Sequence, residues 1–130
     1  MGQPRILVVD DEREVREICA RALQMAGYDT QTAESAQTAM ALVEAAAPDA
    51  ILLDLKMPFV NGLGFLYRLR EAHPHLPVAI VTGVSNLDEV TRGEIHRLGA
   101  DLRYKPLRIV EIQTIANELL DRRLPVSDAT

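Results

Sequence analysis

The sequence has few of the features that mark secreted or membrane proteins. Its 130 residues contain one cysteine, Cys19, so no disulfide can form within the chain and nothing indicates an oxidising compartment. No run of about 18 apolar residues is present, which argues against a membrane-spanning helix. The apolar stretch after Arg5 ends at Val9 and is too short for a signal peptide. We therefore expect a cytoplasmic protein that does not contact a membrane.

Two further absences narrow the chemistry. No Gly-rich turn follows the first apolar run, although a dinucleotide-binding protein would need one there. The three histidines and the single cysteine form no cluster that suits zinc. The net charge of −5 argues against binding to nucleic acid through charge alone. Binding of a dinucleotide, of zinc or of DNA is therefore not expected.

The sequence does contain short strand-like runs that alternate five times with helical patterns. The predicted strands are Ile6–Val9, Asp29–Thr32, Ala50–Leu53, Val78–Val81 and Leu102–Tyr104, of which the second is polar and is expected near a sheet edge. The predicted helices are Glu12–Ala26, a segment capped by Ser35 that extends to Ala47, Leu63–Ala72, Leu87–Leu98 and Ile109–Arg122. Such alternation predicts an α/β fold with a doubly wound parallel sheet.

The polar residues of greatest interest all follow predicted strands. Asp10 and Asp11 end the first strand, Asp54 ends the third, Thr82 ends the fourth and Lys105 follows the fifth. Ligands of open parallel sheets bind beyond the carboxyl ends of the strands. We therefore expect these five side chains to share one site.

The residue types at this site point to a metal ion and a phosphoryl group. Carboxylate oxygens suit Mg²⁺, while a hydroxyl and an ammonium group suit an anion beside the metal. An aspartate can itself accept a phosphoryl group. A simpler reading of Asp10, Asp11 and Glu12 is a solvated helix start, where acids favour the helix dipole. For Glu12 we adopt that reading.

The motifs "VVDDE", "ILLDLKMPFVNG", "VTG" and "YKP" occur in order and at suitable distances. With them the chain resembles the receiver domains of bacterial two-component response regulators, from about Arg5 to Leu120. The resemblance implies a flavodoxin-like sheet of five parallel strands in the order 2-1-3-4-5 with five helices. The receiver would span residues 1–124, and residues 125–130 would be a polar tail or the start of a linker.

The resemblance also implies a role for each matching residue. Asp54 would be the phosphoacceptor of a signalling protein that is not an enzyme. The expected Mg²⁺ ligands are Asp10, Asp11, Asp54 and the backbone carbonyl of Lys56. Thr82 and Lys105 would contact the phosphoryl group, Pro58 and Gly62 would shape the loop after the acceptor, and the Lys105–Pro106 bond would be cis.

The resemblance further implies the partners. A sensor histidine kinase or a histidine phosphotransfer protein would supply the phosphoryl group. An output protein or domain would bind the face formed by the fourth helix, the fifth strand and the fifth helix, and a homodimer is a further possibility. Direct binding of nucleic acid by this domain is not expected.

The sequence departs from the family pattern in two places. The switch aromatic of receivers lies three positions before the lysine, where this chain has Leu102, whereas its aromatic is Tyr104. Gly93 lies inside the fourth predicted helix, where glycine costs about 1 kcal/mol relative to alanine. Either the aromatic is displaced to Tyr104 or the coupling through it is lost.

Two alternatives stay open. The chain can be the excised receiver of a larger, DNA-binding transcription activator. A haloacid-dehalogenase-like phosphatase also forms an aspartyl phosphate with Mg²⁺, but its Asp-x-Asp motif follows the first strand. Here the residue two positions beyond Asp54 is Lys56, so the second acid is missing.

Overall fold

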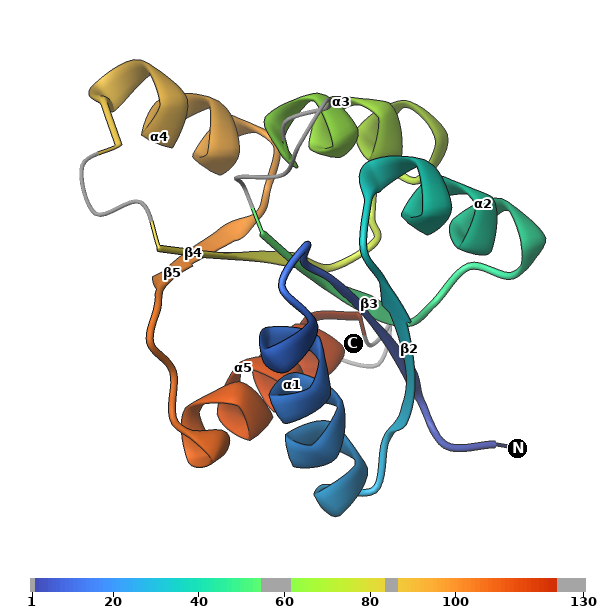
Figure 1. Ribbon diagram of the computed structural model, residues 1–130. Coiled ribbons are helices and arrows are strands. Elements are labelled where there is room, and N and C mark those ends of the chain that lie inside the picture. Colours follow the sequence, from blue (N-terminus) through green and yellow to red (C-terminus); the bar gives the residue numbers. More distant parts are fainter. Residues whose placement is uncertain (1, 55–61, 84–86, 124–130) are drawn as a thin grey trace, which may run out of the picture.

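Five strands and five helices alternate along the chain in the computed structural model, which describes residues 2–54, 62–83 and 87–123. The strands are β1 (Arg5–Val9), β2 (Asp29–Ala33), β3 (Ala50–Leu53), β4 (Val78–Thr82) and β5 (Asp101–Tyr104). The helices are α1 (Arg13–Met25), α2 (Ala36–Ala45), α3 (Gly62–Ala72), α4 (Glu89–Arg97) and α5 (Ile109–Arg123). All strand pairs are parallel, and the order β2-β1-β3-β4-β5 confirms the predicted topology (Figure 1).

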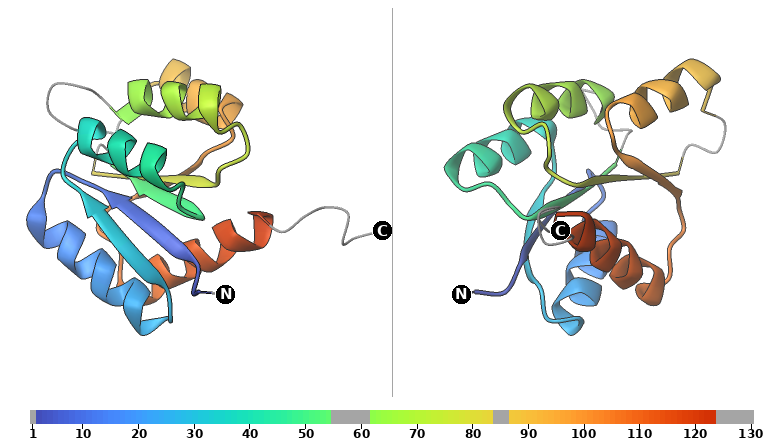
Figure 2. Two further views of the ribbon diagram at one scale, coloured as in Figure 1. Left: turned by 90° about the vertical axis from the view of Figure 1, so that its right-hand side faces the viewer. Right: turned by 180° about the vertical axis from the view of Figure 1, so that it is seen from behind.

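The sheet separates two apolar layers. Alternate residues of a strand face opposite sides. Leu7 and Val9 therefore join the layer beneath α2, α3 and α4, whereas Ile6 and Val8 join the layer beneath α1 and α5. Both further views show α1 and α5 together on one side of the sheet and the other three helices on the opposite side (Figure 2). Because helices cover both faces, β1, β3 and β4 are nearly continuous apolar runs.

The helix ends follow local capping chemistry. Gly27 and Gly99, predicted as helix stops, adopt positive φ angles of 92° and 72° after α1 and α4. The fourth helix begins two residues later than predicted because the Asp88 carboxylate accepts a hydrogen bond from the Thr91 amide, at 2.7 Å. The second helix ends two residues earlier, at Ala45, where extended backbone leads toward Pro48.

Helix α4 is held unevenly. Ile95 is its only buried residue, whereas Val90, in its first turn, is 77% exposed. The Arg70 guanidinium of α3 donates to the Leu98 carbonyl just beyond α4, at 2.5 Å, and the Tyr67 hydroxyl of α3 donates to Glu94. These contacts hold the second half of α4 against α3, while most residues of its first half are exposed.

Within the described residues, no helix combines the length and the apolar character needed to cross a membrane.

The uneven attachment of α4 predicts a contrast between two truncations. Ile95→Ala removes the only fully buried side chain of α4 and should lower the free energy of unfolding by about 2–5 kcal/mol. Val90→Ala, on the same helix, should change it by less than about 0.5 kcal/mol because the side chain is already in water. Urea denaturation of both variants measures the difference, and equal losses would contradict it.

Candidate functional site

Asp10 lies at the centre of the site, where β1 ends and the chain turns into α1. It is 3% exposed, and each of its polar groups has a partner. Its amide donates to the Ala33 carbonyl at 3.1 Å and its own carbonyl accepts from Arg16 at 2.9 Å. Its carboxylate accepts from the Glu12 amide at 2.9 Å and from the Lys105 ammonium at 2.7 Å. Asp10 is therefore buried as a charged group whose hydrogen bonds are satisfied.

Lys105 connects strand ends that are far apart in the sheet. It follows β5, yet its ammonium lies 2.7 Å from Asp10 at the end of β1 and 3.6 Å from Asp54 at the end of β3. Burial alone would lower the pKa of Lys105, but the hydrogen bond to Asp10 and the negative charges of Asp10, Asp54 and Glu12 outweigh burial and raise it. The ammonium is thus a permanent positive charge between buried carboxylates.

Asp54 and Thr82 are held in place by the strand ends that carry them. Asp54 is 5% exposed, and its amide donates to the Val9 carbonyl of β1 at 2.8 Å. Thr82 is fully buried, and its carbonyl accepts from the Lys105 amide at 2.8 Å. The structure therefore brings together the predicted residues of β1, β3 and β5, with Thr82 on β4 between them.

The acids at the start of α1 suit a hard cation. Asp10, Asp11 and Glu12 each place a carboxylate oxygen within 4.8 Å of the other two. Asp11 and Glu12 are exposed, and Glu12, predicted as the first helical residue, is the N-cap that precedes α1, without a capping bond from its side chain. The Glu12 carboxylate also lies 3.6 Å from Lys105, a contact that the reading as a solvated helix start did not include. Oxygen donors of this kind fit Mg²⁺.

Other predicted positions are placed as follows. The Lys105–Pro106 peptide bond is cis, as expected. Gly62, expected in the loop, is a buried residue that begins α3. Lys56 and Pro58 lie outside the described residues.

Leu102 and Tyr104 lie on one face of β5, as a regular strand requires. Leu102 pairs with Ile80 and packs against the core beneath α4, whereas Tyr104 pairs with Thr82 and is 42% exposed. The usual aromatic position is thus filled by an aliphatic core residue. The exposed aromatic ring is that of Tyr104, which is the strand partner of Thr82.

Sequence reasoning missed Arg16. This partly buried residue of α1 donates to the Asp10 carbonyl. The signal that could have found it is its position near the start of a helix that follows the acids. Side chains on a helix lean toward its N-terminus, so an arginine there reaches back to the preceding turn.

Cys19 packs beneath the site and has no chemical role in it. Burial, together with the negative charge of Asp10, raises the pKa of the Cys19 thiol to about 11. The thiol therefore stays protonated and unreactive near neutral pH. This result agrees with the helical spacing that predicts Cys19 on the apolar face of its helix.

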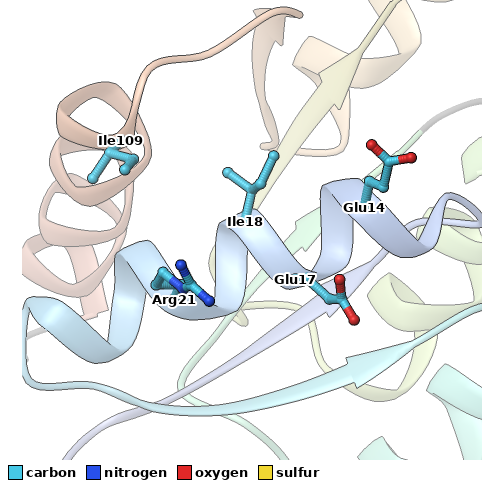
Figure 3. A pocket seen from close by; sticks show the side chains of 5 residues that line it. All are labelled: Glu14, Glu17, Ile18, Arg21 and Ile109. Atoms are coloured by element: carbon cyan, nitrogen blue, oxygen red, sulfur yellow. The ribbon is translucent and has the colours of Figure 1, made fainter.

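A groove between α1 and α5 leads toward the site. Ile18 and Ile109, both about half-exposed, lie on its two sides, with Glu14, Glu17 and Arg21 along α1 (Figure 3). A neighbouring hollow of about 190 Å³ continues from Ile18 to Lys105 and is lined almost entirely by apolar side chains. The apolar surface therefore begins between two helices and ends at the lysine of the site.

Comparison with known proteins identifies close relatives. The sequence profile described as response regulator receiver domain matches residues 6–117. Response regulator MprA of Mycolicibacterium vanbaalenii is 35% identical over 121 residues, which are 93% of this chain and 52% of MprA. The probable transcriptional regulatory protein TcrX of Mycobacterium tuberculosis is 34% identical over 122 residues, again 93% and 52%. The chain spans about half the length of these curated relatives.

Solved structures agree with the sequence matches. The receiver domain of NtrX from Brucella abortus superposes with a TM-score of 0.81 at 34% identity, covering 89% of this chain and 98% of that domain. The chemotaxis protein CheY4 of Vibrio cholerae superposes with a TM-score of 0.83 at 25% identity, covering 92% of this chain and all of CheY4.

The geometry of Asp10 predicts the effect of removing Lys105. Lys105→Met leaves a buried carboxylate without its counter-charge, and it should lower the free energy of unfolding in EDTA by about 3 kcal/mol. In an Asp10→Asn background the same change should cost less, because Asp10 no longer leaves a stranded charge and only Asp54, at 3.6 Å, loses its counter-charge. Denaturant titrations of the two single variants and the double variant give the coupling between the two residues. Additive losses would show that the 2.7 Å contact contributes no stability.

Proposed function

Because this chain belongs to the response regulator receiver domains, we propose that Asp54 accepts a phosphoryl group from a histidine kinase or a histidine phosphotransfer protein. The observation that carries this proposal is the position of the Lys105 ammonium, 2.7 Å from Asp10 and 3.6 Å from Asp54. A positive charge fixed between two buried carboxylates leaves one of them, Asp54, beside a group that can bind phosphoryl oxygens. The domain would be a phosphoacceptor that takes part in its own phosphorylation.

Mg²⁺ fits the acids of this site. Asp10 and Asp11 would hold it together with Asp54, and the family pattern adds the backbone carbonyl of Lys56. When bound, the metal would neutralise charge on the phosphoryl oxygens. The close approach of the Asp10, Asp11 and Glu12 oxygens supports this assignment.

Asp54, Lys105 and Thr82 would have different roles in phosphoryl transfer. A carboxylate oxygen of Asp54 attacks phosphorus, the bond from phosphorus to the imidazole nitrogen breaks, and its electron pair stays on the imidazole. The Asp54 amide is held by β1, so the nucleophile is oriented before the donor arrives. Lys105 and the Thr82 hydroxyl would bind oxygens of the transferred group.

The same contacts would change the signalling face of the domain. Bonds from Thr82 and Lys105 to a phosphoryl group would draw together the ends of β4 and β5, which are already joined by the bond from the Lys105 amide to the Thr82 carbonyl. Helix α4 follows β4 and is buried only at Ile95. Displacing it would therefore disrupt little buried apolar surface. Population would thus shift between two packings of α4, β5 and α5.

The partners would meet different surfaces. The groove between Ile18 and Ile109, together with the apolar hollow that continues to Lys105, suits the protein that brings the phosphoryl group to Asp54 (Figure 3). The output partner would contact the face of α4, β5 and α5. The chain spans about half the length of its curated relatives MprA and TcrX. A DNA-binding output domain on the same polypeptide is therefore a second candidate for that partner.

The phosphatase alternative is less well supported. Its nucleophile follows the first strand, whereas Asp54 follows β3, the central strand of this sheet. At the end of β1, Asp10 is already bound to Lys105 and to the Glu12 amide.

Phosphorylation can be tested directly with a small donor. Acetyl phosphate and Mg²⁺ should add one phosphoryl group to the intact chain, as measured by mass spectrometry, and EDTA should prevent the addition. Asp54→Asn should stay unmodified, while Asp49→Asn, which removes an acid at the opposite end of β3, should be labelled like the parent. Equal labelling of Asp54→Asn would refute the assignment.

The conformational part of the proposal predicts a local change in hydrogen exchange. A beryllofluoride complex should alter amide protection in α4 and β5 more than in α1 or α2, because only the former lie downstream of Thr82. Gly93 should keep α4 among the less protected helices. Asp54→Asn treated in the same way is the control. Unchanged protection across α4 and β5 in the parent would contradict the shift.

A further inference from the structure

Arg16 contacts the turn at residues 10–12, which carries the three acids. It is not one of the charged residues proposed to bind the metal or the phosphoryl group. It lies in the first turns of α1, and its guanidinium donates to the backbone carbonyl of Asp10 at 2.9 Å. The Arg16 amide meanwhile donates to the Glu12 carbonyl at 3.1 Å, as in a regular helix. One residue therefore links the helix to both ends of the turn that carries the acids.

The bond to Arg16 restrains more than one carbonyl. That carbonyl belongs to the planar peptide unit that joins Asp10 to Asp11, so holding it fixes the orientation of the Asp11 amide and Cα as well. The other partners of Asp10 hold its amide and its carboxylate. Of the three polar groups of Asp10, only the carbonyl belongs to the peptide unit that joins Asp10 to Asp11.

The charge of Arg16 makes its position informative. A guanidinium bonded to the backbone of Asp10 carries a positive charge that repels a divalent cation at the neighbouring carboxylates, so charge alone would make Arg16 unfavourable for metal binding. A residue that instead orients metal ligands raises affinity, and losing such an outer contact typically costs about tenfold to a hundredfold. The two effects have opposite signs, which makes them separable by experiment.

We propose that Arg16 is a positioning residue of the cation site, which holds the Asp10–Asp11 peptide so that both carboxylates converge on one ion. The proposal rests on the proposed function, because it assumes that Mg²⁺ binds at these acids. Arg16 itself would contact neither the ion nor the phosphoryl group. It acts through the backbone of Asp10.

Arg13 provides a matched control. It lies on the first turn of the same helix, its side chain is 82% exposed, and it pairs outward with Glu17 at 3.0 Å. Arg13→Met and Arg16→Met each remove one positive charge from a chain of net charge −5, but only the second removes the bond to Asp10. The pair therefore separates charge from positioning.

The measurement is the dissociation constant for Mg²⁺ of each full chain, by calorimetric titration at fixed ionic strength. Arg16→Met should bind Mg²⁺ about tenfold more weakly than the parent. Arg13→Met should bind it as tightly as the parent or more tightly. Arg16→Lys, which can still donate to the carbonyl, should recover part of the loss. If Arg16→Met does not fold, Arg16→Gln replaces it, since its shorter side chain also loses the contact.

Melting in EDTA separates a loss of stability from a loss of affinity, because a merely structural role would lower the melting temperature without changing the dissociation constant. Equal Mg²⁺ affinity of the Arg16 and Arg13 variants, or tighter binding by Arg16→Met, would overturn the inference. The parent and Asp11→Asn test the assumption beneath it. A parent that binds no Mg²⁺, or an Asp11→Asn variant that binds as the parent does, would overturn the metal site itself.

Discussion

The ion pair between Asp10 and Lys105 determines how the ends of the sheet are arranged. In the strand order β2-β1-β3-β4-β5, the two residues belong to strands separated by β3 and β4. The lysine side chain therefore extends across the ends of both intervening strands, and Asp54 and Thr82 lie on those strands. A contact of 2.7 Å over this path leaves little freedom in the relative positions of the four strand ends.

The chemistry of the site opposes its stability. Three neighbouring acids repel one another, and burying Asp10 and Asp54 removes hydration from both charges. One ammonium, raised in pKa by its partners, offsets part of this cost but cannot neutralise every carboxylate. The remaining negative charge is what a divalent cation would neutralise. A bound metal would thus stabilise the site, which is a common property of binding sites.

The fold also distributes its stability unevenly between the site and α4. The backbone groups of Asp10 and Asp54 are bonded to neighbouring strands or to α1. Helix α4, by contrast, has Ile95 in the core and depends on Arg70 and Tyr67 of α3 for its attachment at one end. A rigid site beside a weakly attached helix is suited to converting a local binding event into a larger displacement.

The sequence by itself determined the fold class, the strand order that family resemblance implied and the residues that meet at the strand ends. This was possible because apolar periodicity and parallel topology depend on local patterns, and parallel strands bring their carboxyl ends to one edge. Helix limits near Asp88 and Ala45 were less predictable, because capping competes with periodicity there. The contacts of Arg16 and Glu12 and the one-sided attachment of α4 emerged only from the tertiary structure. They depend on how long side chains cross between elements, and residue order does not specify those distances.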